Sequence, residues 1–298
     1  MKRFLSQSVA LMMTGSLSWA ARCTTVVDPR ALQEYSAYVS SVETARASES
    51  RGGELWWSLA SAKEQAAKSL DSGKPVRHNI SPSETNQRIA QWNGTIIHWI
   101  GAIRIQQTDM TGFKSVLQDY PRCASIYDPI VYDCQAQPIP AETGESYEVT
   151  YGYQNVYRVA LAFPQHYSFL VRSRMDYRDA GSPADPHLVV HQRASEIRES
   201  DSGVPGRDDF LEQFHDHGIL WGLNTYWRAR PNGPDLYVEF EAITLARSVR
   251  DFSCKIGFLP VPKSVVAKVA DSLPAESLQL MLVRTKSESE RRARQRDR

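Results

Sequence analysis

The chain has 298 residues, 42% of them hydrophobic, with 35 Lys and Arg against 34 Asp and Glu and a formal net charge of +1. These values are typical of a globular protein and exclude a mainly disordered, collagen-like or coiled-coil chain. Beyond the N-terminus, no apolar run approaches the roughly 18 residues of a membrane span, which excludes a polytopic membrane protein.

Residues 1–20 have the pattern of a secretory signal peptide. Lys2 and Arg3 form the positive region, residues 9–17 are a short apolar stretch, and Ser18 and Ala20 are small residues suited to cleavage after Ala20. The alternative is an N-terminal membrane anchor, for which the apolar stretch is too short. We therefore expect an exported, periplasmic protein with no transmembrane span once the leader is removed.

Four cysteines follow this leader, and export would place them in an oxidising compartment. Lipid anchoring at Cys23 is an alternative that Arg22 disfavours, because a lipobox has a small residue directly before the cysteine. Cys123 and Cys134 are 11 residues apart and are the favoured disulfide pair, with buried free thiols as the alternative. No zinc-type cysteine spacing is present, so we expect no cysteine metal site.

Residues 21–88 are predicted to form a helical extension and a connector. Apolar residues repeat at helical spacing over residues 31–50, including Leu32, Tyr35 and Val39, which predicts a helix. A second, Ala-rich helix is expected over residues 61–70. Residues 74–87 contain two prolines and several polar residues, which are typical of a connector.

From residue 89 the chain is rich in β-branched and aromatic residues. A strand is predicted over residues 95–105 and a helix over residues 111–120. Six further strand-like runs follow without an intervening helix, at residues 130–136, 147–163, 167–177, 187–198, 219–230 and 236–249. Asn-Gly at 232–233 predicts a hairpin between the last two runs.

The C-terminal part is predicted to be helical. A short helix over residues 263–271 is expected to stop and restart near Ser272, with Pro274 in the first turn of a longer helix. Leu278 and Leu282 point inward on this helix. Residues 287–298 form a basic, charged tail, interpreted as a frayed helix end, with contact to anionic lipid or a partner as the alternative. The body between the two basic ends carries no footprint for nucleic acid.

Runs of strands followed by a helix indicate an α+β fold, in which a curved antiparallel sheet wraps on a long C-terminal helix. Seven segments between residues 90 and 286 carry a resemblance to a known superfamily: HWIG at 98–101, LQDY at 117–120, IYDP at 126–129, GILW at 218–221, NTYWR at 224–228, YVEFEAI at 237–243 and LPAESL at 273–278. The chain resembles uncharacterised secreted bacterial members of the START-like (SRPBCC) helix-grip superfamily. The resemblance implies a helix-grip domain over residues 89–286 that holds an apolar ligand between sheet and helix. It implies no catalytic residue.

The predicted hairpin has one polar and one apolar face. With Asn232-Gly233 as the turn, Arg228 is opposite Tyr237, Tyr226 is opposite Glu239, and Glu241 is opposite Asn224. The polar face has two interpretations. It is either a solvated outer face with cross-strand pairing of charges, or a buried cluster that orients a ligand or acts in acid–base catalysis. The apolar faces line either a solid core or a ligand cavity. The predicted ligand-binding residues are Trp99, Tyr167, Phe169, Val171, Met175, Tyr226, Trp227, Arg228, Val238, Glu239, Phe240 and Glu241.

Other motifs point to no chemistry. His215-Asp216-His217 has the spacing of a partial metal site, but its Gly- and Asp-rich context favours a solvated loop. His187 and His191 are expected at the surface. No GxSxG motif and no glycine-rich phosphate loop is present. We therefore predict no catalytic residue, no metal and no cofactor.

Three functions remain as hypotheses. The first is non-catalytic binding or carriage of a hydrophobic small molecule or lipid between the sheet and the C-terminal helix. The second is a periplasmic protein-interaction module with a solid core and an exposed apolar patch. The third is a cyclase-like or hydrolase-like enzyme that uses Glu241 or Glu239 as acid or base, with Arg228 as its electrostatic partner.

Overall fold

The computed structural model describes residues 24–49, 68–157, 165–182, 185–248, 255–256, 259–260 and 263–296. The predicted leader, Cys23 and Cys254 lie outside these residues, so export and the lipid anchor stay predictions. Most of the second predicted helix, at residues 61–70, also lies outside them. No helix in the described ranges is long and apolar enough to cross a membrane.

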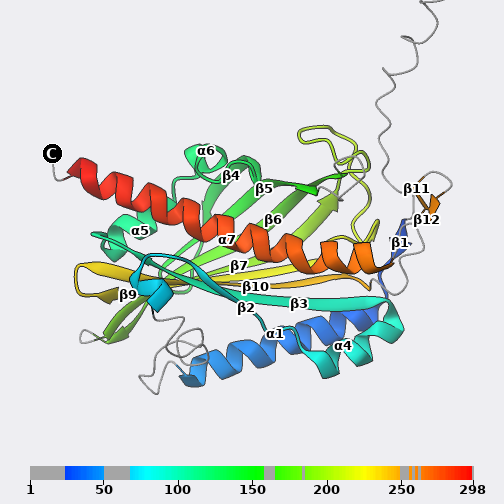
Figure 1. Ribbon diagram of the computed structural model, residues 1–298, viewed down its shortest axis with the longest axis horizontal. Coiled ribbons are helices and arrows are strands. Elements are labelled where there is room, and N and C mark those ends of the chain that lie inside the picture. The colour runs from blue at the N-terminus through cyan, green and yellow to red at the C-terminus, as the bar shows by residue number, and fades with distance from the viewer. Residues whose placement is uncertain are drawn as a thin grey trace, which may run out of the picture.

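One antiparallel sheet of eight strands dominates the molecule (Figure 1). Its spatial order is β2-β3-β10-β9-β7-β6-β5-β4, so the first long strand pairs with the last. The strands are β2 (Val76–Asn79), β3 (Gly94–Ile105), β4 (Val131–Ile139), β5 (Glu145–Tyr157), β6 (Gln165–Ser182), β7 (Asp185–Glu199), β9 (Gly222–Asn232) and β10 (Asp235–Arg247). Strands β1 (Thr25–Val26) and β8 (His215–Asp216) form a separate pair, as do β11 (Lys255–Ile256) and β12 (Leu259–Pro260).

The C-terminal helix α7 (Lys263–Arg296) lies across one face of this sheet (Figure 1). It contacts β2, β3 and β10 near one edge and β5 near the other, so the sheet curves around it. Leu278 and Leu282 are fully buried in a core cluster with Ile103 and Trp227. The α+β helix-grip arrangement predicted from the sequence is confirmed. The predicted break near Ser272 is wrong, because α7 continues through Pro274 as one helix.

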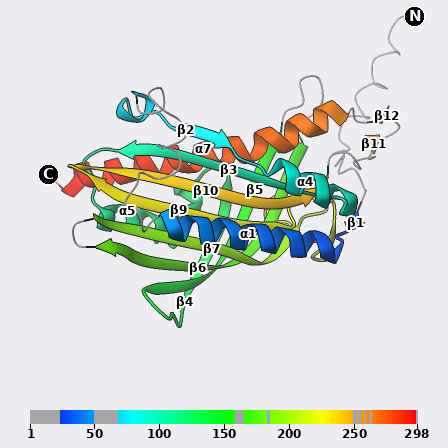
Figure 2. The same cartoon turned by 90° about the horizontal axis from the view of Figure 1, so that it is seen from below.

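The opposite face is covered by the N-terminal helix α1 (Pro29–Glu49) and by α4 (Ser83–Ile89), as Figure 2 shows. Ala31, Tyr35 and Val39 of α1 are buried against strand residues that include Ile96 and Ile243. The helix predicted over residues 31–50 is therefore confirmed. We call this side of the sheet the α1 face and the other side the α7 face.

The predicted connector at residues 74–87 is not a loop. It contains β2, the edge strand beside β3, and the start of α4. The Asn86 side chain donates to the backbone oxygen of Ile96 at 2.8 Å and accepts from its nitrogen at 2.7 Å. This amide acts as a strand partner for β3 and holds α4 against the sheet, a tertiary contact that sequence periodicity does not reveal.

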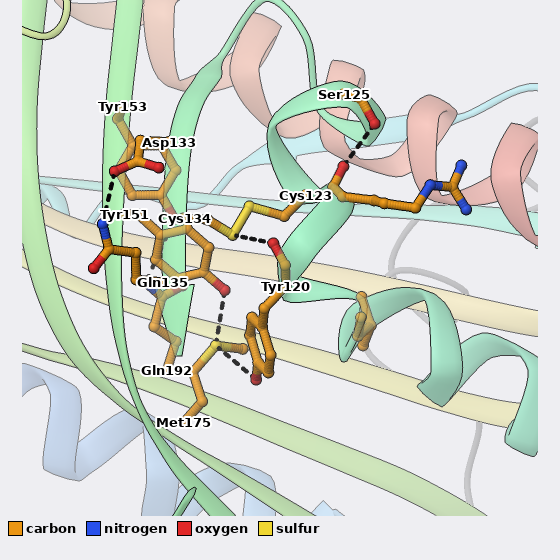
Figure 3. Close-up of a disulfide and its surroundings, with 12 residues drawn as sticks. Tyr120, Cys123, Ser125, Asp133, Cys134, Gln135, Tyr151, Tyr153, Met175 and Gln192 are labelled. Atoms are coloured by element: carbon orange, nitrogen blue, oxygen red, sulfur yellow. Dashed lines mark hydrogen bonds between the residues drawn. A yellow bond between two sulfur atoms is a disulfide. The ribbon is translucent and has the colours of Figure 1, made fainter. Parts of the chain in front are cut away.

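Three short helices and a disulfide lie between β3 and β4 in the chain. Helix α5 (Met110–Leu117) is capped at its N-terminus by Asp109, whose side chain accepts from the nitrogen of Gly112. The short helices η2 (Tyr120–Arg122) and α6 (Cys123–Ile126) follow α5. Earlier in the chain, the short helix η1 (Ala90–Trp92) follows α4. The predicted Cys123–Cys134 disulfide is confirmed and joins α6 to β4 (Figure 3).

The basic tail is part of α7 and is docked, at least as far as Arg296. Ser289 and Ala293 are buried, and the Arg292 side chain donates to the Ser115 backbone oxygen and pairs with Asp119. The frayed helix end predicted for residues 287–298 is therefore wrong for this part of the tail. This part of α7 contacts α5, and Arg292 bonds to Ser115 of that helix.

The β9–β10 hairpin differs from its prediction by two residues. Gly233 and Pro234 form the turn, Gly233 has a φ of 60°, and Asn232 pairs with Asp235. Arg228 is therefore opposite Glu239, and Tyr226 is opposite Glu241. A shift of two residues changes every cross-strand partner but leaves each side chain on its predicted face, since side chains alternate with a period of two.

Candidate functional site

The twelve predicted ligand-binding residues do not form one site. Eight lie on the α7 face, and four lie on the α1 face. The residues on the α7 face are Trp99, Tyr167, Phe169, Val171, Met175, Trp227, Val238 and Phe240. The residues on the α1 face are Tyr226, Arg228, Glu239 and Glu241. Strand alternation explains this division, because neighbours on one strand point to opposite sides.

On the α1 face, five charged or ionisable side chains form a buried ion cluster: Arg46, His98, Arg228, Glu239 and Glu241. Glu241 is fully buried, and its Oε2 accepts from Arg228 Nη2 at 2.7 Å. Its Oε1 accepts from Arg46 Nη2 of α1 at 3.1 Å and lies 2.7 Å from His98 Nε2. Arg228 Nη1 also lies 3.6 Å from Glu239 Oε2. Buried charges of opposite sign are therefore paired.

His98 links this cluster to α1. Its Nδ1 lies 2.7 Å from the hydroxyl oxygen of Tyr38, and its Nε2 faces Glu241. Because an ionised carboxylate can only accept, Nε2 must carry a proton. Burial on its own raises the pKa of Glu241, but Arg228, His98 and Arg46 outweigh it and hold that pKa well below its usual value of 4.5.

The solvated outer face considered for Glu239, Glu241 and Arg228 is wrong, because all three residues are buried. Cross-strand pairing itself is present. Glu241 is held ionised, which is the reverse of what a general acid requires at neutral pH. The carboxylates also lie on the opposite side of the sheet from α7. The geometry thus gives no support to acid–base work by Glu239 or Glu241 between the sheet and that helix.

His191 of β7 adjoins the cluster and is also buried, which corrects its expected surface position. Its ring stacks on Tyr226 with 4.4 Å between centroids, and its Nε2 lies 3.2 Å from the Asn224 side-chain oxygen. The Tyr226 hydroxyl donates to Glu43 of α1 at 3.0 Å. Burial first, and then the charge of Arg193, lower the pKa of His191. These contacts serve the docking of α1.

The α7 face is lined by aromatic side chains. Trp227 and Phe240 stack with 4.2 Å between ring centroids, and Phe113 of α5 meets Trp227 edge-on. The hydroxyls of Tyr151 and Tyr120 converge on the Met175 sulfur, at 3.0 and 3.9 Å (Figure 3). Burial raises the pKa of both tyrosines, so they remain neutral phenols. This part of the face is apolar and uncharged.

A row of polar side chains crosses this otherwise apolar face. Thr225 of β9 donates to the Gln192 side-chain oxygen of β7 at 3.0 Å. The Gln192 side-chain nitrogen donates to Ser173 of β6 at 3.0 Å and lies 3.5 Å from the Tyr153 hydroxyl of β5. We call Tyr153, Ser173, Gln192 and Thr225 the polar row. Ser173, Gln192 and Thr225 are buried.

The row extends in register to Trp99. Thr225 is opposite Ala242, and Ala242 is opposite Trp99, so these residues line up across β9, β10 and β3. Ala242 and Trp99 are only half-buried, although they lie on inner strands of the face that α7 covers. The indole Nε1 of Trp99 is nevertheless buried and has no hydrogen-bond acceptor in the described structure.

Beyond the row lies a second apolar cluster. Phe169, Val171 and Ile197 are buried, and Tyr167 and Leu223 pack against them while only half-buried. The polar row therefore separates two apolar regions of one face. Sequence analysis missed Tyr153, Ser173, Gln192 and Thr225. The available signal was a polar side chain at inward positions of strands whose other inward residues are apolar.

The His215-Asp216-His217 segment is not a solvated loop, because Asp216 and His217 are buried. The Asp216 side chain accepts from Trp221 Nε1 and from the Gly218 nitrogen, both at 2.8 Å. His217 Nδ1 lies 3.1 Å from Glu199 Oε1 at the end of β7. Burial raises the pKa of Glu199. Within the described ranges, no group of three or more His, Cys, Asp or Glu has a geometry suited to a metal ion.

These features define an α+β protein of helix-grip architecture. No family model matches the sequence. No curated protein matches it either.

Several solved structures are similar in fold. The Zhui aromatase/cyclase from Streptomyces sp. R1128 has 14% identity and a TM-score of 0.41, over 66% of this chain and 95% of that one. A STAR-related lipid transfer protein from Xanthomonas axonopodis has 12% identity and a TM-score of 0.40, over 72% and 98%. A START superfamily protein from Mycobacterium smegmatis has 12% identity and a TM-score of 0.38, over 65% and 97%. START-like proteins, which the sequence segments resemble, are thus among the structures of similar fold. The helix-grip architecture of this chain is defined by its own strand order and by the position of α7.

Proposed function

We propose that this protein binds a hydrophobic small molecule or lipid on the α7 face, beside Trp99 and Ala242, without transforming it. The observation that carries the proposal is the exposure of these two residues. Ala242 and Trp99 lie on inner strands beneath a helix, where a solid core would bury them completely. Both keep accessible surface, and both adjoin the polar row.

The surroundings fit such a ligand. Half-buried apolar side chains of the second cluster, including Tyr167 and Leu223, continue the surface away from Trp99. Ligand sites for small molecules are mostly apolar with a few polar groups that fix orientation, as the polar row would here. Burial of the ligand's apolar area would supply its affinity, at about 25 cal/mol per Å² before the costs of binding.

The other two hypotheses gain less from the structure. A protein-interaction module calls for an exposed apolar patch, and Val26 and Val204 are the exposed large hydrophobic residues in the described ranges. Two exposed apolar residues are ordinary on a protein surface. An enzyme that uses Glu241 or Glu239 would need those carboxylates beside its substrate, whereas they belong to the buried ion cluster on the α1 face.

The first experiment is native mass spectrometry of the purified protein, followed by organic extraction. The second is titration with 1,6-diphenylhexatriene, an uncharged apolar probe that fluoresces when it leaves water. We expect a complex of one probe per chain. Ala242→Phe places a ring on the proposed surface, where it takes the space of the probe. The probe then loses its apolar contact with this surface, so its affinity should fall at least about tenfold.

Ala37→Phe is the matched control, because Ala37 is exposed on α1, on the other side of the sheet. It should leave probe affinity unchanged. If Ala242→Phe does not fold, Leu223→Phe tests the same surface. The proposal is overturned if the wild-type protein carries no co-purified molecule and binds no probe, or if the folded variants bind it as tightly as the wild type.

A further inference from the structure

The C-terminal half of α7 has a row of arginines on its outward side. Leu278, Leu282 and Thr285 are buried and follow one stripe of the helix, which faces the sheet (Figure 1). A second stripe lies on the side away from the sheet, where residues recur at spacings of three and four. We call it the arginine stripe, and its members are Arg284, Ser287, Arg291 and Arg294.

The cations of this stripe are exposed and only partly paired. Arg284 and Arg294 are exposed and have no ion-pair partner among the residues that the structure describes. The Arg291 side chain is 40% exposed and pairs with Glu288 at 2.7 Å. Arg122 of η2 is 50% exposed and lies 3.3 Å from the same carboxylate. One acidic group is therefore shared by two arginines, while two further arginines face solvent alone.

The other ions of this end of α7 cancel one another. They form the pairs Lys286–Glu290, Arg292–Asp119 and Arg296–Asp109. The exposed acid Glu276 is more than two turns away from Arg284 along the helix. The stripe and Arg122 thus present four arginines against the one carboxylate of Glu288. Such a local surplus of one sign of charge attracts a partner of the opposite sign.

The stripe suits a layer of anionic charge better than it suits a folded protein. From Arg284 to Arg294 it extends about 15 Å along one straight helix, at about 1.5 Å per residue. Protein interfaces are built around buried apolar and aromatic anchors. The exposed large hydrophobic residues in the described ranges are Val26 and Val204, which both lie outside α7. With a net charge of +1, the chain also has no wider basic footprint for nucleic acid.

We propose that the arginine stripe, together with Arg122, docks the protein on a membrane surface that contains anionic lipid. The guanidinium groups bond to lipid phosphates. Each arginine near such a surface strengthens binding about fivefold, so four of them give an affinity of about 1 mM for accessible anionic lipid. Docking of this strength is reversible. It uses the outer side of α7 and does not depend on the ligand proposed for the α7 face of the sheet.

The test is co-sedimentation of the purified protein with lipid vesicles. The anionic vesicles are an about two-to-one mixture of phosphatidylcholine and phosphatidylglycerol, which has a negative surface potential. Vesicles of phosphatidylcholine alone are the neutral reference. We expect binding to the mixture and none to the neutral vesicles. Binding should fall at least about fivefold when the salt concentration is raised from about 0.1 M to about 1 M, because salt screens exposed charges.

A triple variant locates the contact on α7. Changing Arg284, Arg291 and Arg294 to Gln should weaken vesicle binding at least about twentyfold. The fold should be retained, because Glu288 keeps Arg292 as a partner at 2.8 Å, and circular dichroism checks it. The matched control removes three exposed arginines that lie outside the stripe and should bind within about twofold of wild type. Its substitutions are Arg88→Gln, Arg178→Gln and Arg207→Gln.

Both variants have the same net charge, so a difference between them reports the position of the charges. The proposal is overturned if the wild type binds neither vesicle, if it binds both equally, or if the two triple variants bind alike. Soluble polyglutamate represents an acidic protein. If it binds in a manner that requires the stripe while the anionic vesicles do not bind, the partner is an acidic protein and the lipid surface is ruled out. None of these results changes the probe titration that tests the proposed function.

Discussion

At the scale of single residues, Glu241 shows how this fold tolerates a buried charge. Removing a carboxylate from water is expensive, and its burial is repaid only by close partners of opposite charge and by hydrogen bonds. Glu241 receives bonds from Arg228 on its own sheet, from Arg46 on α1 and from the ring of His98. Its negative charge therefore ties helix to sheet.

We predict that Glu241→Gln lowers the free energy of unfolding by about 3–5 kcal/mol, because two arginine side chains then lose a buried counter-charge. The measurement is urea denaturation followed by circular dichroism. Glu34→Gln is the control, since Glu34 meets Arg88 at 3.4 Å in a pair that is partly exposed. Such a pair contributes about 0–1 kcal/mol. Equal effects of the two substitutions would contradict the role given to Glu241.

At the scale of elements, the seating of α7 on β3 depends on Gly101. A Cβ at this position would overlap Leu278 Cδ2 and lie 2.9 Å from Leu282 Cδ1. The helix therefore approaches the strand more closely here than any side chain would allow. Farther along, the Lys286 side chain donates to the Arg104 backbone oxygen at 2.9 Å, so polar contacts continue the same seam.

We predict that Gly101→Ala destabilises the protein by about 1–3 kcal/mol through overpacking against α7. The cost should fall by more than about 1 kcal/mol in a Leu278→Ala background, because that substitution makes room for the new methyl group. Thermal or urea unfolding of the four proteins in this double-mutant cycle measures the coupling. Additive effects would show that the overlap with Leu278 is not the cause of the destabilisation.

At the scale of the whole molecule, one sheet separates two interiors of different character. The α7 face is aromatic with neutral polar groups, whereas the α1 face holds the buried ion cluster. Strand alternation allows this arrangement, and the two helices complete it by covering both sides. The predicted extension thus contributes a helix, α1, to the structure that surrounds the sheet.

The ionisable groups predict how the stability of the molecule depends on pH. Ion pairing and hydrogen bonds lower the pKa values of Glu241, Asp235 and Asp176 in spite of their burial. In the unfolded chain these groups take up protons first as the pH falls, so their stabilisation is lost in acid. Burial raises the pKa values of Glu199 and Asp216, which opposes this trend.

Because the lowered pKa values prevail, we predict that the free energy of unfolding decreases steadily as the pH falls from about 5 to about 3. Urea unfolding at a series of pH values measures it. The decrease should be shallower in Glu241→Gln, because this variant lacks a carboxyl group whose pKa is strongly lowered by folding. A wild-type stability that is constant or rising over this range would contradict the prediction.

Much of the fold could be predicted from local patterns. The long strands have alternating or β-branched sequences, Asn232-Gly233 marks the hairpin, and the Cys123–Cys134 pair has a spacing that suits a local bridge. The segments that were predicted wrongly take their structure from contacts with residues far away in the chain. Examples are the strand and helix within residues 74–87, which are held by β3, and the helical tail, which is held by Asp119 and Ser115.

The candidate site was predictable only in part. Trp99, Met175, Trp227 and Phe240 follow from apolar alternation, since a strand shows which residues share a face. The same alternation correctly grouped Tyr226, Arg228, Glu239 and Glu241. It carries no information about which helix covers each group, and so it placed the two groups in one site.

By itself, the sequence determined the order of the long strands along the chain, the α+β class and the two faces of each of those strands, because these depend on local periodicity. Only the tertiary structure decided that α1 covers the polar face and α7 the apolar one. It also decided that the hairpin turns at Gly233-Pro234 and that the polar row lines up with Trp99 across the strands. Those features depend on pairing between residues far apart in the chain. Local sequence patterns do not reveal the energy of such pairing.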